Sequence, residues 1–586
     1  KVYVSEKALP LANGIKVQRQ KLKKWIEDGQ WPYQELDLTL HKLQQPLTTE
    51  EARADKAQYD QRFLQIKEDI RKIFAEVLIL DEDEIGDFDH FVTDLGGDSL
   101  SVIGVIAQLE EKYNLFIPDT EFTQAVNIHD IAELIYAKLY GEDEVNQPKK
   151  AEASPSAGGG RITDFEQTEE WKAFQKRLEA SGAEELNPYF VAHDSTVRDT
   201  SLVGGKEVIN LGSYNYLGMS GHPETVRAAK EAIDKYGTSA SGSRVLAGEK
   251  TLYQELEETI ARWKHAEAAI VMTGGYATNL CFIGHFAGKD DLILYDALSH
   301  NSIVAGCQLS QGESKSFPHN DIAALEQTLK AVEGKYTKVL LVVEGVYSMD
   351  GDIAPIPEFV RLKKQYGAFL MVDEAHSGGV IGKNGGGVDE YFGLAPEDID
   401  IKMGTLSKAL GTCGGYIAGK KSLVDYLKYQ MPGFVFTAGI SPPLAAAAKR
   451  AIELLQEDPA IVQRLHDNIA YFVKGAKARG LDTILAAESA IVPVRIGSDE
   501  MAFLASHKML ERGVFVPPAV FPAVAKGQSG YVVIVPEGFG QALMDAAATG
   551  GDVPELETVY SYYSLEGNLM DQEVNEYLGV ARAYAG

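Results

Sequence analysis

The chain has 586 residues, of which 45% are hydrophobic and 24% are charged. This length exceeds what a single hydrophobic core supports, so we expect about three or four domains. The formal net charge of -29 argues against a protein that binds nucleic acid or an anionic membrane, because both need a positive protein surface.

The absence of targeting signals and the spacing of the cysteines indicate the cellular compartment. No apolar run reaches the length of a membrane span, and no charged-then-apolar signal segment opens the chain. The cysteines are far apart and form neither a metal-ligand pattern nor a disulfide framework: Cys281, Cys307 and Cys413. We therefore expect a cytoplasmic protein without a metal site.

Residues 1–45 form the first segment. The stretch LPLANGIKVQR at 9–19 predicts a hairpin turn, and the basic KLKKWIEDG after it predicts a helix. The stretch resembles the C-terminal tail of adenylate-forming enzymes, and that resemblance places Lys16 where a lysine contacts the acyl adenylate. Alternatively, Lys16 is a solvated surface residue. Because the chain opens on Lys1 rather than methionine, we expect more of that domain upstream and no adenylation activity from the tail.

Residues 60–142 predict a four-helix bundle. Apolar residues recur at helical spacing from Phe63 to Val77 and from Leu100 to Leu109, and IHDIAELIYAKLYG at 128–141 predicts a final helix. The stretch after it, 143–161, is rich in charge, proline, serine and glycine, which is typical of a flexible linker.

The motif DLGGDSL at 94–100 places Ser99 after a Gly-Gly turn, at the start of a helix. Helix N-termini favour anionic groups, so a phosphodiester on Ser99 is well placed there; alternatively, Asp98 or Ser99 simply caps the helix. GGDSL resembles the phosphopantetheine attachment site of acyl and peptidyl carrier proteins. The resemblance implies that a phosphopantetheinyl transferase attaches 4'-phosphopantetheine to Ser99 and that acyl groups ride on it as thioesters.

Beyond 162, short apolar strands alternate with helices up to about residue 440, which indicates a mostly parallel sheet with helices on both faces. Strands then follow with different spacing in AIVPVRIG, GVFVPP and GYVVIVP, and they predict a smaller α+β domain over 441–586. The whole is a multidomain chain whose large α/β domain covers 162–440.

The strand ends of the large domain carry the parts that a pyridoxal phosphate (PLP) enzyme needs. GTLSKALG at 404–411 places Lys408 in a loop after a strand, where it can form a Schiff base with PLP. VDEAHS at 372–377 ends another strand, so Asp373 can pair with the pyridine nitrogen and His376 can orient the ring.

Other strand ends supply the remaining contacts. The backbone of Gly275 and Tyr276, at a helix start, can hold phosphate, together with the hydroxyls of Thr405 and Ser407. His300 in DALSHNS can stack on the cofactor, and Ser348 in VEGVYSMDGDIAP can bond the pyridoxal 3-oxygen. Taken singly, this histidine more often has a structural role, and this serine can merely stabilise a turn.

These motifs resemble the α-oxoamine synthases of PLP fold type I, the aspartate aminotransferase-like fold, over about 163–525. LGSYNYLG at 211–218 and VEGVYSMDGDIAP at 343–355 are most similar to serine palmitoyltransferases. The resemblance implies that Tyr214 and Asn215 approach the amino acid. It also implies a homodimer in which Ser243 serves the neighbouring subunit; a monomer is the alternative.

The implied reaction is a decarboxylative condensation of an amino acid with an acyl thioester, carried on Ser99, to give an α-oxoamine. The resemblance implies an acyltransferase in which Lys408 is the base and His376 and His300 are catalytic. Two alternatives stay open: a PLP aminotransferase that acts on a carrier-bound acyl group, and a non-catalytic PLP-like scaffold.

Two departures from the family pattern bear on these alternatives. NGGG at 384–387 has Gly386 where the family commonly has arginine, and the strand GYVVIVP lacks the arginine that usually clamps the substrate carboxylate. The amino acid therefore stays open between serine, glycine, alanine and a less common one.

Overall fold

The computed structural model describes the chain in segments, and in the first of them only as backbone. The described residues are 2–4, 11–12, 16–17, 34–36, 49–78, 80–82, 85–89, 91, 95, 99–113, 115–117, 127–140, 163–168, 171–172, 174–175, 187–486, 488–520, 523–524 and 528–539.

Short strands form the N-terminal segment. β1 (Val2–Val4) pairs antiparallel with β4 (Gln34–Leu36), and β2 (Leu11–Ala12) pairs antiparallel with β3 (Lys16–Val17). The second pair encloses the predicted turn and places Lys16 on its returning strand. The helix predicted after it lies outside the described residues.

Three helices follow: α2 (Thr49–Leu78), α3 (Ser99–Tyr113) and α5 (Ile128–Tyr140). Their apolar residues are buried at helical spacing, as Ile70 and Phe74 on α2 and Ile131 and Ile135 on α5 illustrate. The predicted helical segment is thus confirmed, with Ser99 as the first residue of α3. A fourth helix of the predicted bundle is not among the described residues.

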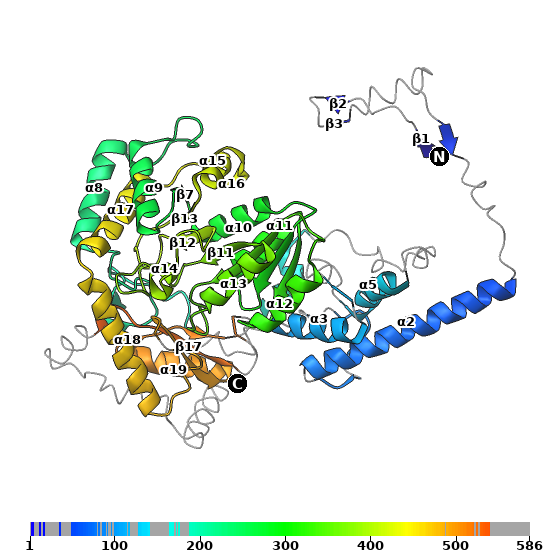
Figure 1. The fold of residues 1–586 in the computed structure, drawn as a ribbon. Helices are drawn as coiled ribbons and strands as arrows, with labels where there is room; N and C mark the ends of the chain where they lie inside the picture. Colours follow the sequence, from blue (N-terminus) through cyan, green and yellow to red (C-terminus); the bar gives the residue numbers. More distant parts are fainter. Residues whose placement is uncertain are drawn as a thin grey trace. The chain divides into compact units, whose positions relative to one another are not determined.

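A seven-stranded sheet forms the centre of the large domain (Figure 1). All neighbouring strands are parallel except β13, which is antiparallel to both of its neighbours. In sheet order the strands are β7 (Ala268–Met272), β13 (Gly415–Gly419), β12 (Ile401–Thr405), β11 (Phe369–Asp373), β10 (Val339–Glu344), β8 (Leu292–Asp296) and β9 (Glu313–Phe317).

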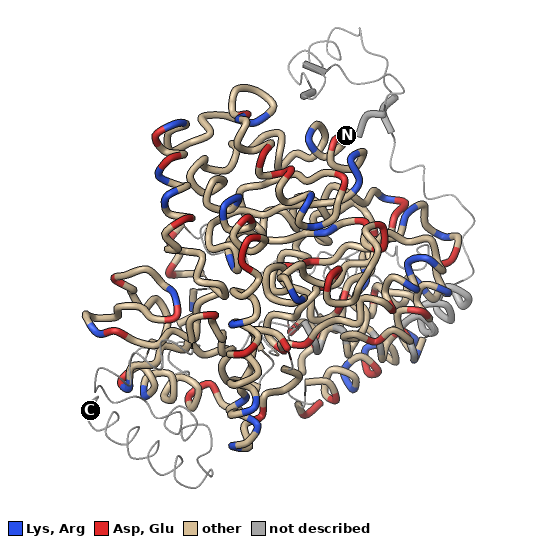
Figure 2. Tube along the Cα trace, turned by 60° about the vertical axis from the view of Figure 1, so that its left-hand side comes forward, with Lys and Arg blue, Asp and Glu red and all other residues tan. Residues whose placement is uncertain are grey.

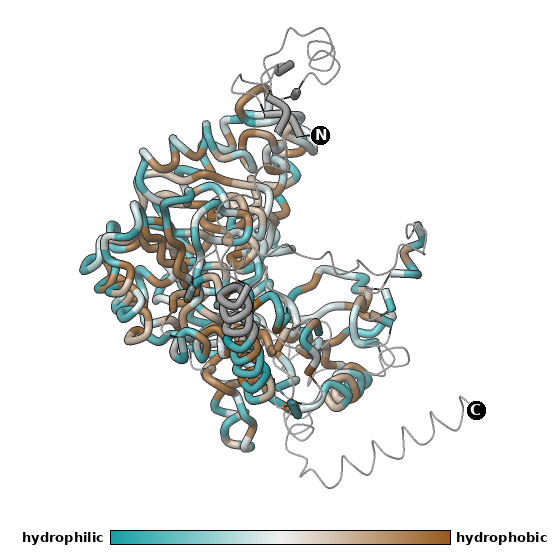
Figure 3. The backbone as a smooth tube through the Cα atoms, turned by 90° about the vertical axis from the view of Figure 1, so that its right-hand side faces the viewer, coloured by the Kyte–Doolittle hydropathy of each residue, from teal (hydrophilic) through white to brown (hydrophobic). Residues whose placement is uncertain are grey.

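Both faces of this sheet are buried. Leu341 and Val343 of β10 join one apolar cluster, and Leu340 and Val342 of the same strand join another. Alternate residues of a strand point to opposite faces, so each cluster is the core on one side of the sheet. Figure 3 shows hydrophobic segments in the middle of this domain's trace and hydrophilic ones on its outer turns. The predicted mostly parallel, doubly covered sheet is confirmed.

Helices supply the cover. α17 packs against α8 and α9, and α10 packs against α11 (Figure 1). The helices of this domain are α8 (Pro223–Tyr236), α9 (Thr251–Trp263), α10 (Gly275–Phe286), α11 (Asn301–Leu309), α12 (Ile322–Ala331), α13 (Ile356–Tyr366), α14 (Val388–Phe392), α15 (Lys421–Gln430), α16 (Pro432–Val435) and α17 (Pro442–Glu457). The short 3-10 helix η3 (Phe165–Gln167) precedes them.

The C-terminal part contains α18 (Ala460–Ala478), α19 (Asp499–Glu511) and a three-stranded antiparallel sheet. That sheet orders β14 (Ile491–Gly497), β17 (Ser529–Ile534) and β16 (Pro518–Ala519). The predicted α+β character of this part is therefore confirmed.

One predicted strand, GVFVPP, divides in two. Its first part, β15 (Val514–Phe515), pairs in parallel with β6 (Lys206–Asn210), which also pairs with β5 (Thr200–Val203). Its second part, β16, joins β17 instead. Pro517 lies between the two parts, and because proline has no N–H group it cannot continue a ladder of backbone hydrogen bonds.

Three findings concern the expectations from composition: membrane-spanning helices, the distribution of charge and the state of the cysteines. No helix in the described part of the chain is both long and apolar enough to cross a membrane. Figure 2 shows acidic and basic residues interspersed along the drawn trace. All three cysteines are free thiols, in line with the absence of a disulfide pattern in the sequence.

Candidate active site

The predicted site residues follow the carboxyl ends of five strands of the large sheet. β12 leads to Lys408, β11 ends at Asp373, β10 leads to Ser348, β8 leads to His300 and β7 leads to Gly275. Four of these strands are parallel to one another and β7 is separated from them only by β13, so the segments gather at one edge of the sheet.

Lys408 lies half-buried in this edge. Its Nζ is 2.6 Å from Nε2 of His376 and 5.3 Å from the ring centroid of Tyr214. Burial lowers the pKa of Lys408, and the nearby carboxyl groups of Asp373 and Glu344 only partly oppose this effect. A larger share of Lys408 is therefore neutral amine, which can accept a proton.

His376 links Lys408 to a buried tyrosine that the sequence analysis did not single out. The Oη of Tyr216 is 2.6 Å from Nδ1 of His376, and Tyr216 is 0% exposed. Burial, and then Lys408, holds the pKa of His376 well below 6.5, so the ring is neutral. Burial also keeps the pKa of Tyr216 well above 10. Tyr216 follows the predicted Tyr214 by two residues in SYNYLG, which was the available signal.

These contacts assign the proton on the imidazole. Tyr216 Oη has no other hydrogen-bond partner among the described residues, so its buried hydroxyl donates to Nδ1 of His376. The single ring proton of a neutral histidine then lies on Nε2, which faces Lys408 Nζ.

Asp373 is fixed by two donors. Its Oδ1 accepts the N–H of Ala375 at 2.9 Å, and its Oδ2 accepts Nδ2 of Asn279 at 2.7 Å, while the side chain is almost fully buried. Asn279 also bonds Ser302 Oγ at 2.9 Å. Asn279 was missed in the sequence; its signal is its position one helical turn after Gly275, on the same face of α10.

His300 caps α11. The ring Nδ1 of His300 accepts the backbone N–H of Ser302, and the backbone N–H of His300 donates to Glu344 Oε1 at 2.5 Å. Burial, aided by Lys408, lowers the pKa of His300 against the opposing effect of Asp373. Burial, and then Asp373, raises the pKa of Glu344 well above 4.5. Glu344 was also missed, although an acidic residue that ends the apolar run LLVVE is unusual in a buried strand.

A candidate phosphate cradle lies at the junction of β7 and α10. Gly275 and Tyr276 open α10, where the first N–H groups of a helix lack intrahelical partners. A Cβ on Gly275 would stand 2.8 Å from Thr405 Oγ1, and Thr405 Oγ1 is 2.7 Å from Ser407 Oγ. The cradle therefore requires glycine and combines free N–H groups with two hydroxyls. Together with buried Asp373 and neutral His300, it fits PLP.

Other predicted residues have different surroundings. The amide of Asn215 is fully used, because Nδ2 donates to Val197 O and Ser220 O and Oδ1 accepts the N–H of Ser220. Ser243 Oγ donates to Val435 O of its own chain at 2.6 Å. Ser348 is half-buried and has no hydrogen-bond partner in the described part of the chain.

The two sequence departures also have structural surroundings. At Gly386 a Cβ would stand 2.8 Å from Cβ of Glu390, and Lys264 Nζ donates to Gly386 O at 2.6 Å. Lys264 also pairs with fully buried Glu374 at 2.5 Å, so this lysine ties the backbone at Gly386 to a buried carboxylate. β17 contains no arginine, as its sequence requires.

A second polar cluster lies at the same edge of the sheet. His319 Nδ1 is 2.8 Å from Asp296 Oδ1, and its Nε2 is 3.0 Å from Asp352 Oδ2. Burial alone would lower the pKa of His319, but the hydrogen bonds to Asp296 and Asp352 outweigh burial and raise it to about 10. Asn320, in the left-handed region with φ 53°, donates to both carboxylates. We call these four residues the His319 clamp.

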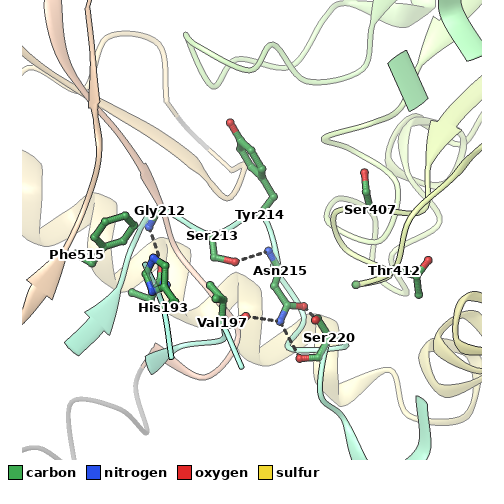
Figure 4. Close-up of a pocket in the computed structure, with 12 residues that line it drawn as sticks. His193, Val197, Gly212, Ser213, Tyr214, Asn215, Ser220, Ser407, Thr412 and Phe515 are labelled. Carbon is green, nitrogen blue, oxygen red and sulfur yellow. Dashed lines mark hydrogen bonds between the residues drawn. The ribbon is translucent and has the colours of Figure 1, made fainter. Parts of the chain in front are cut away.

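A cavity of about 330 Å³ lies beside the lysine loop; we call it the His193 pocket. Figure 4 shows Ser407 and Thr412 on one side of it and His193 with Phe515 on the other, with Tyr214 on the segment between. The residues that line it are His193, Val197, Asn210, Gly212, Ser213, Tyr214, Asn215, Ser220, Ser407, Gly411, Thr412 and Phe515.

Two family models match the chain. The model described as "Aminotransferase class I and II" matches residues 206–538, and the model described as "Phosphopantetheine attachment site" matches residues 68–135. The first contains every residue of the candidate sheet-edge site, and the second contains Ser99.

Curated relatives and solved structures agree with these models. The 8-amino-7-oxononanoate synthase of Thermoanaerobacter pseudethanolicus is 41% identical over 59% of this chain and 87% of its own. 8-Amino-7-oxononanoate synthase 1 of Bacillus subtilis is 42% identical over 56% and 83%. The structure of Sphingomonas wittichii serine palmitoyltransferase is 32% identical with a TM-score of 0.62, over 71% of this chain and 99% of its own. A variant of the S. paucimobilis serine palmitoyltransferase with a bound PLP–myriocin aldimine is similar at 31% identity and the same TM-score, over 71% of this chain and 100% of its own.

Proposed function

The chain belongs to the aminotransferase class I and II family, where it groups with 8-amino-7-oxononanoate synthases and serine palmitoyltransferases, and from this premise we propose that it condenses an amino acid with an acyl thioester to form an α-oxoamine and CO2. The single observation that supports this most is the 2.6 Å contact between Lys408 Nζ and His376 Nε2, beside the buried carboxylate of Asp373.

PLP, when bound, draws electrons away from the α-carbon of the amino acid and so eases loss of its proton and its carboxylate. Lys408 would hold the cofactor covalently, Asp373 its pyridine nitrogen, and Ser348 its 3-oxygen. His300 would lie against its ring, and the phosphate would lie at the cradle formed by Gly275, Tyr276, Thr405 and Ser407.

Proton movement is the task of this chain's own side chains. Lys408, once released from the cofactor, is the base for the α-proton, because burial keeps part of it as neutral amine. His376 presents an Nε2–H group to the same position, and Tyr216 keeps that proton in place by donating to Nδ1. Burial of both residues keeps bulk water from this proton path.

The acyl group arrives on the phosphopantetheine of Ser99, at the first residue of α3, after a phosphopantetheinyl transferase has attached the arm. We further propose that the catalytic unit is a homodimer in a reducing cytoplasm and that residues 1–45 derive from an adenylate-forming domain with Lys16 at its lysine position. The proposed segments are 1–45, 60–142, a linker at 143–161, 162–440 and 441–586.

Two other activities would use the same fold. An aminotransferase would move an amino group to a keto acid without releasing CO2, and a scaffold would bind the carrier without chemistry. The relatives with 41% and 42% identity are synthases, which favours condensation. The connected contacts from Tyr216 to His376 to Lys408 favour a working site over a scaffold.

The test uses the purified full chain loaded with PLP. Serine, glycine and alanine are added in turn while the visible absorbance of the bound cofactor is recorded, and then the acyl group is loaded on the Ser99 arm. We expect one amino acid to change the absorbance and then to release CO2 from its carboxyl group only when the acyl group is present. A Ser99→Ala chain has no hydroxyl for the arm and cannot be loaded, so it should release no CO2 under the same conditions.

Each other outcome contradicts condensation. Transfer of the amino group to an added keto acid, without CO2, supports the aminotransferase. An absorbance that no amino acid changes supports the scaffold and indicates that the substrate carboxylate has no binding partner here.

A further inference from the structure

The residues that line the His193 pocket are mostly polar, and none of them is Lys, Arg, Asp or Glu. The two that titrate are His193 and Tyr214. Burial lowers the pKa of His193 despite the nearby Asp194, and burial raises the pKa of Tyr214, so both are uncharged near neutral pH. A carboxylate or a phosphate would find no opposite charge among these lining residues, and a long alkyl chain would leave their polar atoms unsatisfied.

The orientation of the His193 ring follows from a short chain of hydrogen bonds. Asn210 Oδ1 accepts the N–H of Gly212 at 3.0 Å, so the Nδ2 of Asn210 is the group that donates to Ser201 Oγ at 3.3 Å. Ser201 is 2% exposed, and its hydroxyl proton therefore needs an acceptor. That acceptor is Nδ1 of His193, at 2.9 Å. The ring proton of His193 then lies on Nε2.

His193 consequently offers an N–H donor. Its Nε2 has no hydrogen-bond partner among the described residues, and the edge-on contact of its ring with Phe515, at 4.7 Å between centroids, fixes the plane of the imidazole. Ser220 Oγ also lacks a partner in the described part of the chain, while Ser213 Oγ only accepts, from the N–H of Asn215. The pocket thus presents the ring donor of His193 and the hydroxyls of Ser213 and Ser220 to an occupant, on a lining that also includes Tyr214, Ser407 and Thr412.

The pocket opens beside the lysine. Ser407, which lines it, directly precedes Lys408, and Tyr214, which also lines it, lies 5.3 Å from Lys408 Nζ. Its volume of about 330 Å³ is at the small end of ligand pockets. We therefore expect a slender, uncharged and hydrogen-bonding occupant that lies next to the lysine loop.

This chain carries a group of that kind on its own attachment site, since the segment 68–135 matches a phosphopantetheine attachment model. A pantetheine arm is uncharged beyond its phosphate, has two amides that both donate and accept hydrogen bonds, and ends in the thioester. Resting on the function proposed above, we propose that the His193 pocket holds the amide-bearing part of the pantetheine arm, with His193 Nε2–H bonded to an amide carbonyl.

The experiment uses the full PLP-loaded chain with Ser99→Ala, so that no covalent arm competes. The probe is S-butyl-pantetheine, an unreactive thioether, and its Kd is measured by calorimetry. His193→Phe keeps a ring against Phe515 but removes the donor, and we expect it to weaken binding about fivefold to tenfold, as for one lost hydrogen bond. Ser220→Ala, which removes a hydroxyl without a protein partner, should weaken binding about twofold to fivefold.

The matched control is His507→Phe, because His507 is exposed on α19 and pairs with Glu511 at 3.4 Å. It should leave the Kd unchanged. A kinetic comparison sharpens the result: His193→Phe should raise the KM of butyryl-pantetheine, whereas His507→Phe should leave it within about twofold.

The outcomes separate this inference from the proposed reaction. If the thioether binds through His193 and no condensation occurs with any amino acid, the reaction is wrong and the pocket assignment stands. If condensation occurs and His193→Phe changes neither the Kd nor the KM of the pantetheine compounds, the pocket assignment is wrong. A change only in the absorbance response to the amino acid also overturns it, because the pocket then holds the amino acid.

Discussion

His376 and His319 both lie beyond the carboxyl ends of strands in one sheet, yet they are held in opposite charge states. His376 has an uncharged tyrosine at 2.6 Å and a lysine at 2.6 Å, so burial lowers its pKa well below 6.5. His319 lies between two carboxylates at 2.8 Å and 3.0 Å, which raise its pKa to about 10. Burial acts in the same direction on both, so their partners decide the outcome.

The comparison separates a place where a proton can move from a place where charge is fixed. Burial keeps the imidazole of His376 neutral and lowers the pKa of Lys408 beside it, so the lysine is able to accept a proton there. The His319 clamp instead joins the end of β8 to the 345–353 turn, which carries Ser348, and Ser489 Oγ of the C-terminal part donates to Gly351 O of that turn. The clamp is therefore expected to position the turn and to take no part in proton transfer.

The largest expected effect comes from removing Lys408, the lysine beside neutral His376. Lys408→Ala should lower the rate of CO2 release by about a thousandfold or more, because in the proposed reaction Lys408 is both the attachment point of the cofactor and the base. Borohydride reduction followed by mass spectrometry should find no cofactor on the variant. Lys335→Ala, at an exposed lysine, is the control and should leave both readouts unchanged.

The next effect is on stability and concerns the clamp. His319→Asn should cost about 3 kcal/mol near pH 6, because it leaves the fully buried carboxylate of Asp296 without its charged partner. The folded pKa of His319, about 10, is above the unfolded value of 6.5, so the stabilisation is complete below about pH 6.5 and is lost as the pH rises toward 10.

Urea unfolding at several pH values, followed by circular dichroism, measures this difference. The gap between the native chain and His319→Asn should shrink from pH 6.5 to pH 10. The exposed pair of His507 with Glu511 provides a control, and His507→Asn should cost less than about 0.5 kcal/mol. A gap that is the same at every pH would mean that His319 is neutral and that the comparison with His376 is wrong.

The smallest effect tests the proton assignment of His376. Tyr216→Phe removes the hydroxyl that donates to Nδ1, so the proton is no longer held on Nε2, and we expect about a tenfold loss of activity. Nitrogen NMR of the imidazole should show a mixture of the two tautomers. Tyr253→Phe is the matched control, since Tyr253 is equally buried and donates one hydrogen bond, to Ile440 O.

Both variants should lose about 1 kcal/mol of stability, as for one buried hydrogen bond. Only Tyr216→Phe should change the tautomer and the rate. Equal rates for the two variants would show that the tyrosine contact is structural and does not set the histidine proton.

Much of this arrangement could be predicted because it depends on local pattern. Lys408, Asp373 and Gly275 each follow an apolar strand, and strand ends of a parallel sheet meet at one edge. Tyr216 and Asn279 could not be identified in the same way, because their partners, His376 and Asp373, lie far away in the sequence. A buried hydrogen bond between distant segments leaves no periodic trace in either one.

The same limit explains Asn215 and the division of GVFVPP. The resemblance predicts that Asn215 approaches the substrate; the structure adds that its amide bonds Val197 and Ser220, contacts that no motif encodes. Pro517 was visible in the sequence, yet the choice of β6 as the partner of β15 depends on where the β5–β6 strand pair lies, far away in the sequence.

The pairing of β15 with β6 has a consequence for biosynthesis of the chain. β6 leads directly into the segment that carries Tyr214, but its parallel partner is made only after the whole large sheet has been translated. We expect the attachment segment of 68–135 to fold and be modified while the ribosome is still extending the chain. The strand β6, in contrast, can pair with β15 only after Val514 and Phe515 have been made. Nascent chains should therefore carry phosphopantetheine on the attachment segment before the site that receives its acyl group is complete.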